Sequence, residues 1–206
     1  MPEAFHPCTV TADRLRLERG GRAVLDGLSF SASAGEAVEL VGPNGSGKTT
    51  LLRALAGLAA PDAGAITHPE PEQIAFSGHA DPLKPSETVE TALRFWARLH
   101  GRDEAEVVTA LAAMRARHLK RRECGRLSAG QRRRVALARV ILLNRPVWLL
   151  DEPAAPLDAA GRTSLAEAVT AQRARGGLVI AATHQGLDWP DAQRLDLALL
   201  EGEAVR

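Results

Sequence analysis

The sequence predicts an α/β fold in which a mixed core sheet is joined by an antiparallel β layer and a helical subdomain. An apolar run at 37–41 leads into a glycine-rich loop and then into leucines at helical spacing. Two further apolar runs, 147–150 and 178–182, are typical of strands that are buried on both faces of a parallel sheet. Residues 83–143, which lie between the glycine-rich loop and the apolar run at 147–150, have no strong strand signal. We therefore expect a single domain, 1–206, with its helical subdomain at about 83–143.

The antiparallel layer is predicted from two segments near the N-terminus. Leu15 and Leu17 alternate with charged residues, and Leu28, Phe30 and Ala32 alternate with serines. A period of two is typical of a strand that is buried on one face and solvated on the other. These segments are therefore expected to form half-buried strands outside the core sheet.

Helices are predicted where apolar residues recur every three or four positions. Gly57 and Pro61 are expected to stop the first of them. The predicted helices are 49–58, a stripe of Val89, Leu93, Trp96 and Leu99, then 103–114, a helix from Ser128 through Leu143, and one that Asp158 caps between the two apolar runs.

Charge and composition argue against several classes of function. The 26 lysines and arginines nearly cancel the 25 aspartates and glutamates, so we expect no nucleic-acid partner. No apolar stretch approaches the ~18 residues of a membrane span, and the N-terminus lacks the features of a signal peptide. We expect a cytosolic chain that reaches a membrane only through a partner. Cys8 and Cys124 lack metal-ligand spacing and are interpreted as buried or bystander thiols.

The glycine-rich loop at 42–49 matches the phosphate-binding pattern G-x-x-x-x-G-K-[ST] in the predicted strand, loop and helix setting. Its backbone N–H groups can converge on phosphate oxygens, Lys48 can reach the β/γ-phosphates, and the Thr49 hydroxyl can bind Mg²⁺. The residues predicted to bind the nucleotide here are Gly42, Pro43, Asn44, Gly45, Ser46, Gly47, Lys48, Thr49 and Thr50.

Two carboxylates follow the apolar run at 147–150. The strand is expected to bring Asp151 to the Mg²⁺ side of the phosphates, where it serves with Thr49 as a metal ligand. The adjacent Glu152 can polarise an attacking water. An isolated Asp-Glu pair is more often a solvated loop, but its place after a buried strand, downstream of a phosphate-binding loop, favours a catalytic role.

The segment 127–131, Leu-Ser-Ala-Gly-Gln, resembles the signature of the ATP-binding-cassette (ABC) ATPases, with Ala129 in place of the first glycine. Ser128 and Gln131 also fit a capping box, so the segment is expected to start a helix as well. The resemblance implies that Ser128, Gly130 and Gln131 contact ATP held by the opposite subunit. One chain has one phosphate-binding loop and one signature, so the partner is a second copy or a homologous ATPase domain.

Further elements of the ABC pattern appear in order along nearly the whole chain. Asp158, in 156–158, stands where the D-loop belongs, and His184 corresponds to the switch histidine that contacts the γ-phosphate. Two positions depart from the general pattern. His79 replaces the usual Q-loop glutamine, and it is either part of the mechanism or the exposed end of a strand. Arg19 stands where many members place an aromatic residue against adenine, and its guanidinium could stack on the base.

The chain is similar to the CcmA family, the ATPase subunits of the haem exporter of bacterial cytochrome c maturation. The similarity lies in the segments 78–84, 87–89, 95–96, 127–134 and 148–153. It implies ATP and Mg²⁺ as cofactors, a CcmB-like membrane subunit with a CcmC-like protein, and a place on the cytoplasmic face of the inner membrane. An ATPase subunit of a transporter for another small molecule or lipid is the alternative.

Two other classes of protein remain in competition. A soluble ABC protein acting on ribosomes or DNA usually has two cassettes or a long coiled-coil insertion, which this chain lacks, and a P-loop kinase has no use for 127–131. The triplet 132–134, three arginines, is interpreted as a solvated helix face rather than a nucleic-acid patch.

Overall fold

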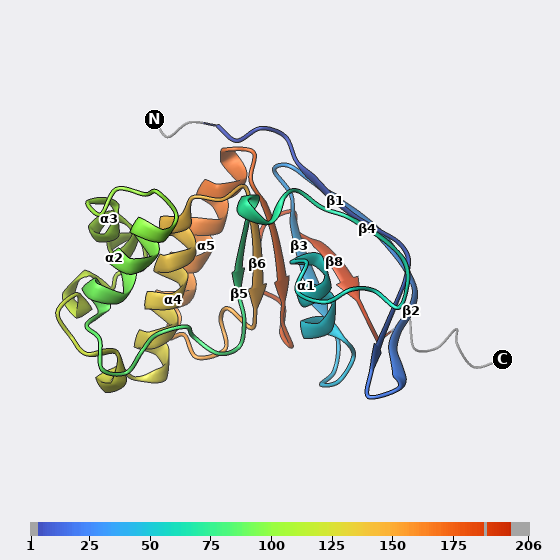
Figure 1. The fold of residues 1–206 in the computed structure, drawn as a ribbon, viewed down its shortest axis with the longest axis horizontal. Coiled ribbons are helices and arrows are strands. Elements are labelled where there is room, and N and C mark those ends of the chain that lie inside the picture. Colours follow the sequence, from blue (N-terminus) through green and yellow to red (C-terminus); the bar gives the residue numbers. More distant parts are fainter. Residues whose placement is uncertain (1–3, 188, 199–206) are drawn as a thin grey trace.

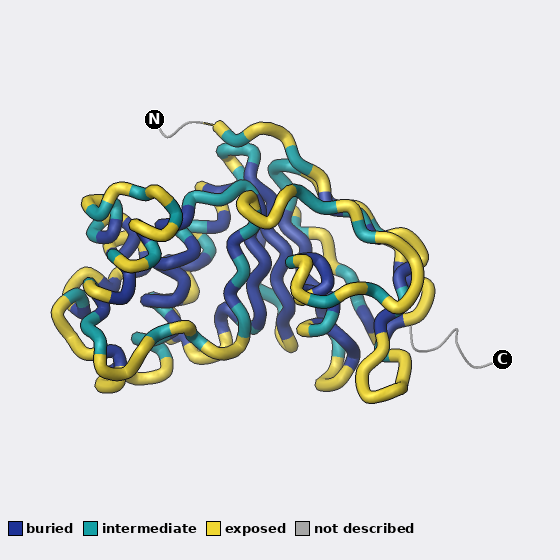
Figure 2. Tube along the Cα trace, viewed as in Figure 1, coloured by how far each residue is buried: buried dark blue, intermediate teal, exposed yellow. Residues whose placement is uncertain are grey.

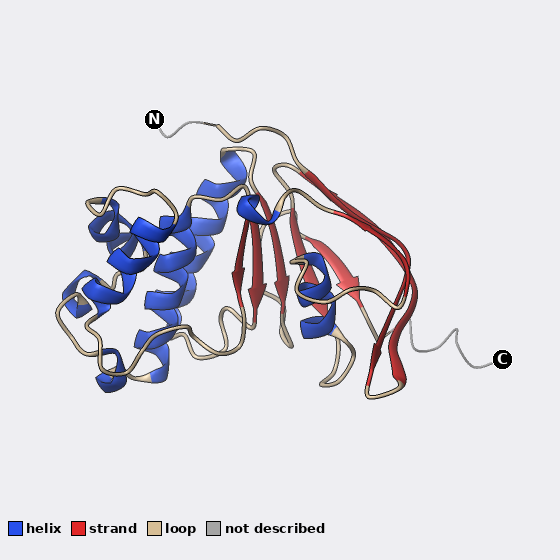
Figure 3. Cartoon of the chain, in the orientation of Figure 1, coloured by secondary structure: helices blue, strands red, loops and turns tan. Residues whose placement is uncertain are grey.

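The computed structural model describes residues 4–187 and 189–198. These residues form a parallel sheet, an antiparallel sheet and a group of helices, arranged side by side (Figure 1). The helices α2, α3, α4 and α5 lie on one side of the parallel sheet, and α1 and the antiparallel sheet lie on the other (Figure 3). The parallel sheet thus separates the helical part of the chain from its antiparallel part.

The antiparallel sheet has the strand order β2-β1-β4. Its strands are β1 (Thr9–Arg19), β2 (Arg22–Ser33) and β4 (Ala63–Thr67). Inward residues of β1 and β2 such as Leu15, Leu17 and Leu28 are buried, while their charged and serine neighbours are largely exposed. The predicted alternation and the antiparallel pairing of these two strands are confirmed.

The parallel sheet has the strand order β5-β6-β7-β3-β8. Its strands are β3 (Ala37–Val41), β5 (Ile74–Ser77), β6 (Val147–Asp151), β7 (Leu178–Ala182) and β8 (Gln193–Asp196). The central strands β3, β6 and β7 are buried at every position, as the continuous apolar runs predicted. The carboxyl ends of β3 and β6 lead directly into the glycine-rich loop and the Asp151–Glu152 pair, so both motifs lie at the same edge of the sheet.

The helices of the described residues begin and end at clearly defined positions. The α-helices are α1 (Lys48–Leu55), α2 (Val89–Leu99), α3 (Glu106–Ala113), α4 (Ala129–Leu143) and α5 (Ala159–Ala174). Single 3₁₀ turns are η1 (Pro71–Gln73), η2 (Arg117–Leu119) and η3 (Cys124–Arg126). Asp158 caps α5 through the N–H of Gly161, and Ser128 caps α4, as predicted.

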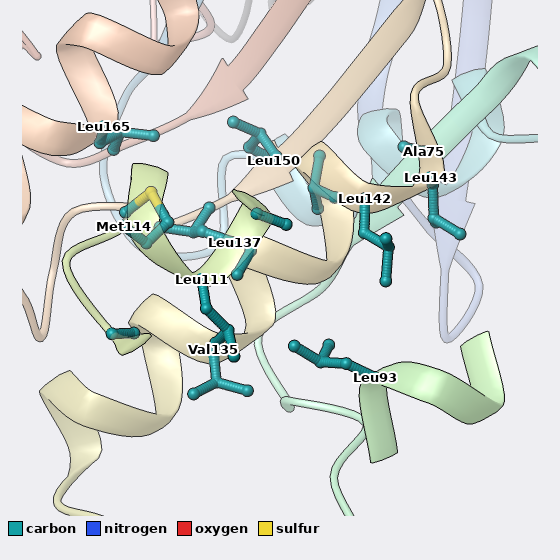
Figure 4. Packing of buried hydrophobic residues seen from close by; sticks show 14 of the residues in the cluster. Ala75, Leu93, Leu111, Met114, Val135, Leu137, Leu142, Leu143, Leu150 and Leu165 are labelled. Atoms are coloured by element: carbon teal, nitrogen blue, oxygen red, sulfur yellow. The ribbon is translucent and has the colours of Figure 1, made fainter. Parts of the chain in front are cut away.

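Two hydrophobic clusters lie on the two faces of the parallel sheet. One includes Trp148, Leu150, Val179 and Ala181 together with residues of α2, α3, α4 and α5. Figure 4 shows Leu93, Leu111, Leu137 and Leu150 among the side chains of this cluster. The other includes alternate residues of the same strands, such as Leu149 and Ile180, and packs them against α1 and the antiparallel sheet. Figure 2 shows the central strands of the parallel sheet as buried, while exposed segments lie around the helical and antiparallel parts on either side.

The structure differs from the predictions in three details. The predicted antiparallel layer is present as a separate sheet, but the core sheet is parallel throughout its described strands, whereas we expected it to be mixed. The strands β4 and β8 were not predicted, because most of their residues are exposed or polar and carry no clear period. The first helix ends at Leu55 rather than at Leu58, since the chain turns at Ala56 and Gly57 has a left-handed φ of 70°.

Candidate active site

The glycine-rich loop connects the buried strand β3 to α1. Gly47 is the N-cap of α1 with a left-handed φ of 86°, and a Cβ there would lie 3.0 Å from Cγ of Leu25. Glycine is favoured at this position, because a side chain would be strained at this φ and its Cβ would press against Leu25 of the antiparallel sheet. Among the described residues, no side chain caps the first turn of α1, so its N–H groups remain available to an anion.

Lys48 lies across the loop rather than in solvent. Its Nζ donates to the carbonyl oxygens of Gly42 and Pro43 at 2.6 and 2.7 Å. Burial lowers the pKa of Lys48, and the nearby carboxylates of Glu152 and Asp151 oppose that shift. The ammonium group therefore stands at the loop with acidic groups facing it.

Asp151, at the end of β6, faces the start of α1. The Thr49 hydroxyl lies 3.0 and 3.2 Å from the two carboxylate oxygens of Asp151. A hydroxyl and a carboxylate are oxygen donors of the kind that Mg²⁺ uses beside nucleotide phosphates. The buried Ser46 hydroxyl has no hydrogen-bond partner among the described residues, so the loop also holds a polar group suited to a phosphate oxygen. The donor set fits a Mg²⁺–nucleotide.

Glu152 directly follows the strand and has a left-handed φ of 47°, which is strained for a residue with a side chain. Its N–H donates to the carbonyl of Ala182 on β7 at 3.0 Å. Oε1 of Glu152 lies 3.1 Å from Nε2 of His184, but the two atoms do not align as a hydrogen bond. The turn thus aims the carboxylate toward His184, which lies just beyond the end of β7.

These groups line one pocket of about 260 Å³ at the carboxyl edge of the parallel sheet. The lining residues are Arg19, Val24, Asn44, Gly45, Gly47, Lys48, Thr49, Thr50, His79, Asp151, Glu152 and His184. The structure therefore brings together residues from five separate segments, and all three predicted catalytic residues are among them. Val24 was not predicted, because a single valine in an alternating strand gives no functional signal.

The predicted signature residues line a different pocket of about 380 Å³. Its lining residues are His118, Leu119, Ser128, Gly130, Gln131, Arg134, Pro156 and Asp158. Ser128 and Gln131 form the predicted capping box, since each side chain bonds the backbone of the other residue. A Cβ on Gly130 would lie 2.7 Å from the carbonyl oxygen of Pro156, so glycine allows the segment 156–158 to approach the turn.

Arg134 connects the turn to the segment that caps α5. Its guanidinium pairs with the carboxylate of Asp158. The N–H of Gly161 and the Arg134 guanidinium hold the pKa of Asp158 below its usual value. The charged form of Asp158 is therefore favoured at the second pocket.

The interpretation of residues 132–134 as a solvated helix face is wrong for Arg133. Arg133 is 3% exposed, and Arg132 and Arg134 are half-buried. Arg133 lies four residues before Leu137 and seven before Val140, both buried, and this spacing keeps all three on one helix face. Helical periodicity alone could have indicated its burial. Asp81 pairs with Arg133 at 3.2 Å. From the sequence, Asp81 was included only within the segment 78–84, and no role was predicted for it.

The two departures from the general pattern both reach the first pocket. His79 is exposed and lines this pocket as well as two neighbouring ones. Arg19, at the end of β1, is exposed and lines the same pocket. Of the two thiols, Cys124 is buried and Cys8 is partly buried, and both are free.

Comparisons with known proteins agree with this arrangement. A family model described as ABC transporter matches residues 25–155. The solved structure of an ABC transporter ATP-binding protein from Pyrococcus furiosus has a TM-score of 0.83 at 26% identity, covering 93% of this chain and 98% of that one. The fold and the phosphate-binding pocket thus define the chain as an ATP-binding subunit of the ABC transporter class, an ATPase.

Two relatives narrow the class further. The cytochrome c biogenesis ATP-binding export protein CcmA of Maricaulis maris is 50% identical over 200 residues, which are 94% of each chain. The protein of the same name from Rhodobacter capsulatus is 52% identical over 189 residues, 92% of this chain and 87% of that one. The chain belongs to the CcmA family. None of the helices in its described part combines the length and apolar character that a membrane span requires.

Proposed function

We propose that the chain is the ATP-hydrolysing subunit of a haem export complex for cytochrome c maturation, bound peripherally at the cytoplasmic face of the bacterial inner membrane. The observation that carries the proposal is the 50% identity over nearly the full length to a cytochrome c biogenesis export protein. In this proposal residues 1–206 are one ATP-binding domain.

The glycine-rich loop, residues 42–50, holds the phosphates of ATP. Lys48 moves from the loop carbonyls to the β/γ-phosphates, a short displacement for its flexible side chain. Thr49 and Asp151 hold Mg²⁺, and their 3.0 Å contact supports this pairing. When bound, Mg²⁺ neutralises charge that develops on the phosphate oxygens. Arg19 lines the same pocket, where its guanidinium plane can stack on adenine.

Glu152 accepts a hydrogen bond from the attacking water and so acts as its base. The strained turn aims its carboxylate into the pocket, beside His184, whose ring faces the γ-phosphate. His79 lies at the same pocket and takes the place of the usual glutamine, where a neutral imidazole can accept a hydrogen bond from bound water.

Two copies are required to complete each site. Ser128, Gly130, Gln131 and Asp158 line a pocket that shares no lining residue with the phosphate-binding pocket. A second chain, or a homologous ATPase domain, therefore supplies these groups to the γ-phosphate. ATP between the two chains makes the dimer depend on nucleotide.

The membrane partner is a CcmB-like spanning subunit, associated with a CcmC-like protein. The helical subdomain at about 83–143 is the part of the chain that docks the membrane subunit. Haem contacts these partners rather than this chain.

A complementation experiment tests the haem-export role. Host cells that lack this chain should lose covalent haem staining of their c-type cytochromes. A plasmid copy of the chain should restore the staining, and the Glu152→Gln variant, expressed at the same level, should not. Normal cytochromes in the cells that lack the chain would contradict the proposal and favour a transporter for another small molecule or lipid.

Purification of the tagged chain from membranes tests the partners. We expect a CcmB-like and a CcmC-like protein to come with it, as identified by mass spectrometry. Recovery of the membrane subunits of a different transporter would overturn the assignment of these partners.

A further inference from the structure

The guanidinium of Arg133 lies between two loops that border the active-site pocket. Arg133 belongs to α4 and its side chain is 4% exposed. All of its donor contacts within the described residues point toward the carboxyl ends of β5 and β6. They are the carbonyl oxygens of Gly78 at 3.0 Å, Pro153 at 3.3 Å and Asp151, the carboxylate of Asp81 at 3.2 Å, and the Ser77 hydroxyl at 3.4 Å.

One side of this network holds the backbone around Glu152. The carbonyls of Asp151 and Pro153, which accept from Arg133, lie directly before and directly after Glu152 in the chain. Glu152 itself has a left-handed φ of 47°, a conformation that persists only where neighbouring groups hold it. Arg133 therefore restrains the turn that determines where the Glu152 carboxylate points.

The other side of the network holds the loop that carries His79. The contacts to Gly78 and Asp81 lie on the two sides of His79. The side chain of Asp81 is only 12% exposed, so its pair with Arg133 is largely shielded from solvent. Removal of either partner would leave a buried charge without its counterpart. The His79 loop and the Glu152 turn are thus attached to one rigid planar group.

Arg133, Glu152 and His79 also line a common pocket of about 380 Å³. A buried arginine is not required for packing alone, because an apolar side chain of similar volume serves a helix–sheet contact as well or better. What the planar, five-donor guanidinium adds is a fixed orientation of several acceptors at once.

We propose that Arg133 is a positioning residue for ATP hydrolysis, which sets the direction of the Glu152 carboxylate and couples it to the His79 loop. This inference rests on the proposed role of Glu152 as the base. A movement of the His79 loop is transmitted through Arg133 to the turn that aims Glu152.

The test compares variants of the full-length chain in steady-state ATP hydrolysis. Arg133→Lys keeps the charge but loses the planar fork, so kcat should fall about 10–100-fold while KM for ATP stays within about twofold. Asp81→Asn removes only the ion pair and should lower kcat less. Arg139→Lys is the matched control, since Arg139 is buried on the same helix but contacts the Phe76 carbonyl and the Trp96 ring. Its kcat should stay within about twofold of wild type.

A second background separates positioning from stability. In single-turnover release of labelled phosphate, Arg133→Lys should have no further effect on the slow hydrolysis of Glu152→Gln, because Arg133 acts through that carboxylate. A merely structural role would lower both backgrounds by the same factor, and thermal unfolding would show the loss of folded protein. If Arg133→Lys fails to fold, Asp81→Asn carries the same test in both backgrounds.

Three results have distinct meanings. An unchanged kcat in Arg133→Lys, or an equal fall in the two backgrounds, would overturn the role of Arg133 and leave that of Glu152 intact. Full activity of Glu152→Gln alone would overturn the proposed base, and with it this inference. A fall in the hydrolysis rate that occurs when residue 152 is glutamate, but not in the Glu152→Gln variant, supports both the role of Arg133 and that of Glu152.

Discussion

The start of α1 and the start of α4 both face a pocket, but they are built differently. Gly47 gives α1 no side-chain cap, so within the described part of the chain the N–H groups of its first turn are available to an anion, with Lys48 beside them. At α4, the Ser128 side chain already accepts from the N–H of Gln131. The start of α1 therefore offers more N–H groups to an anion than the start of α4 does. In the proposed dimer, ATP binds at α1 first and α4 of the partner joins afterwards.

The largest expected effect concerns the carboxylate at the first pocket. Glu152→Gln should slow hydrolysis roughly 10²–10⁴-fold, because the amide cannot accept the proton of the attacking water. ATP binding should survive, so the variant should accumulate as an ATP-bound dimer. Light scattering or gel filtration with Mg²⁺-ATP measures the dimer, and wild-type hydrolysis in this variant would remove Glu152 from its role.

The next largest effect distinguishes the two pockets directly. Ser128→Arg should abolish the ATP-dependent dimer and lower hydrolysis about 10²-fold, while the monomer still binds nucleotide. Lys48→Ala should instead lose nucleotide binding in the monomer. A fluorescent ATP analogue and gel filtration distinguish the two results. If Ser128→Arg weakened nucleotide binding to the monomer as much as Lys48→Ala, the two pockets would not be independent.

A smaller effect is expected at His79, which borders the first pocket. His79→Ala should bind ATP almost normally but lose partner-stimulated hydrolysis by about tenfold, as for an outer ligand of a metal site. His79→Gln should retain the stimulation. Full stimulation in His79→Ala would show that His79 merely follows a strand and takes no part in hydrolysis.

The smallest effect concerns the stability of the second pocket. The carboxylate of Asp158 has a lowered pKa in the folded chain, so its charge stabilises the fold above the usual aspartate pKa of about 4. This stabilisation is lost as the pH falls through the lower folded value. Asp158→Asn keeps a side chain that can cap α5 but loses the carboxylate charge that pairs with Arg134. Urea unfolding should show it to be slightly less stable than wild type at pH 7 and equal in strong acid, whereas Asp158→Ala should lose the cap at both.

Much of the fold could be predicted from local sequence pattern. The strands β3, β6 and β7 are buried on both faces, so their apolar runs are continuous and their boundaries were predicted to within one residue. The edge strand β8 and the exposed strand β4 carry little apolar signal. Their pairing depends on the tertiary structure, with β8 aligned on β3 and β4 on β1.

The candidate site was predictable to the extent that its motifs are local. The glycine-rich loop, Asp151, Glu152 and His184 were all expected at strand ends, where the sheet brings them together. Arg133 could not be placed in this way, because its partners come from β5, β6 and the loop at 78–81. Helical spacing could indicate that the middle arginine of 132–134 is buried, but only the fold shows which groups its guanidinium contacts.

The separation of the two pockets within one chain has a consequence for genetics. In the proposed dimer, an allele with Lys48→Ala and an allele with Ser128→Arg are each expected to abolish function alone. In a cell that expresses both alleles, a mixed dimer can form. One of its nucleotide sites then pairs the unchanged glycine-rich loop of the Ser128→Arg chain with the unchanged start of α4 of the Lys48→Ala chain. That site is free of both substitutions. Two null alleles of one gene should therefore complement each other in part, as is otherwise expected of mutations in different genes.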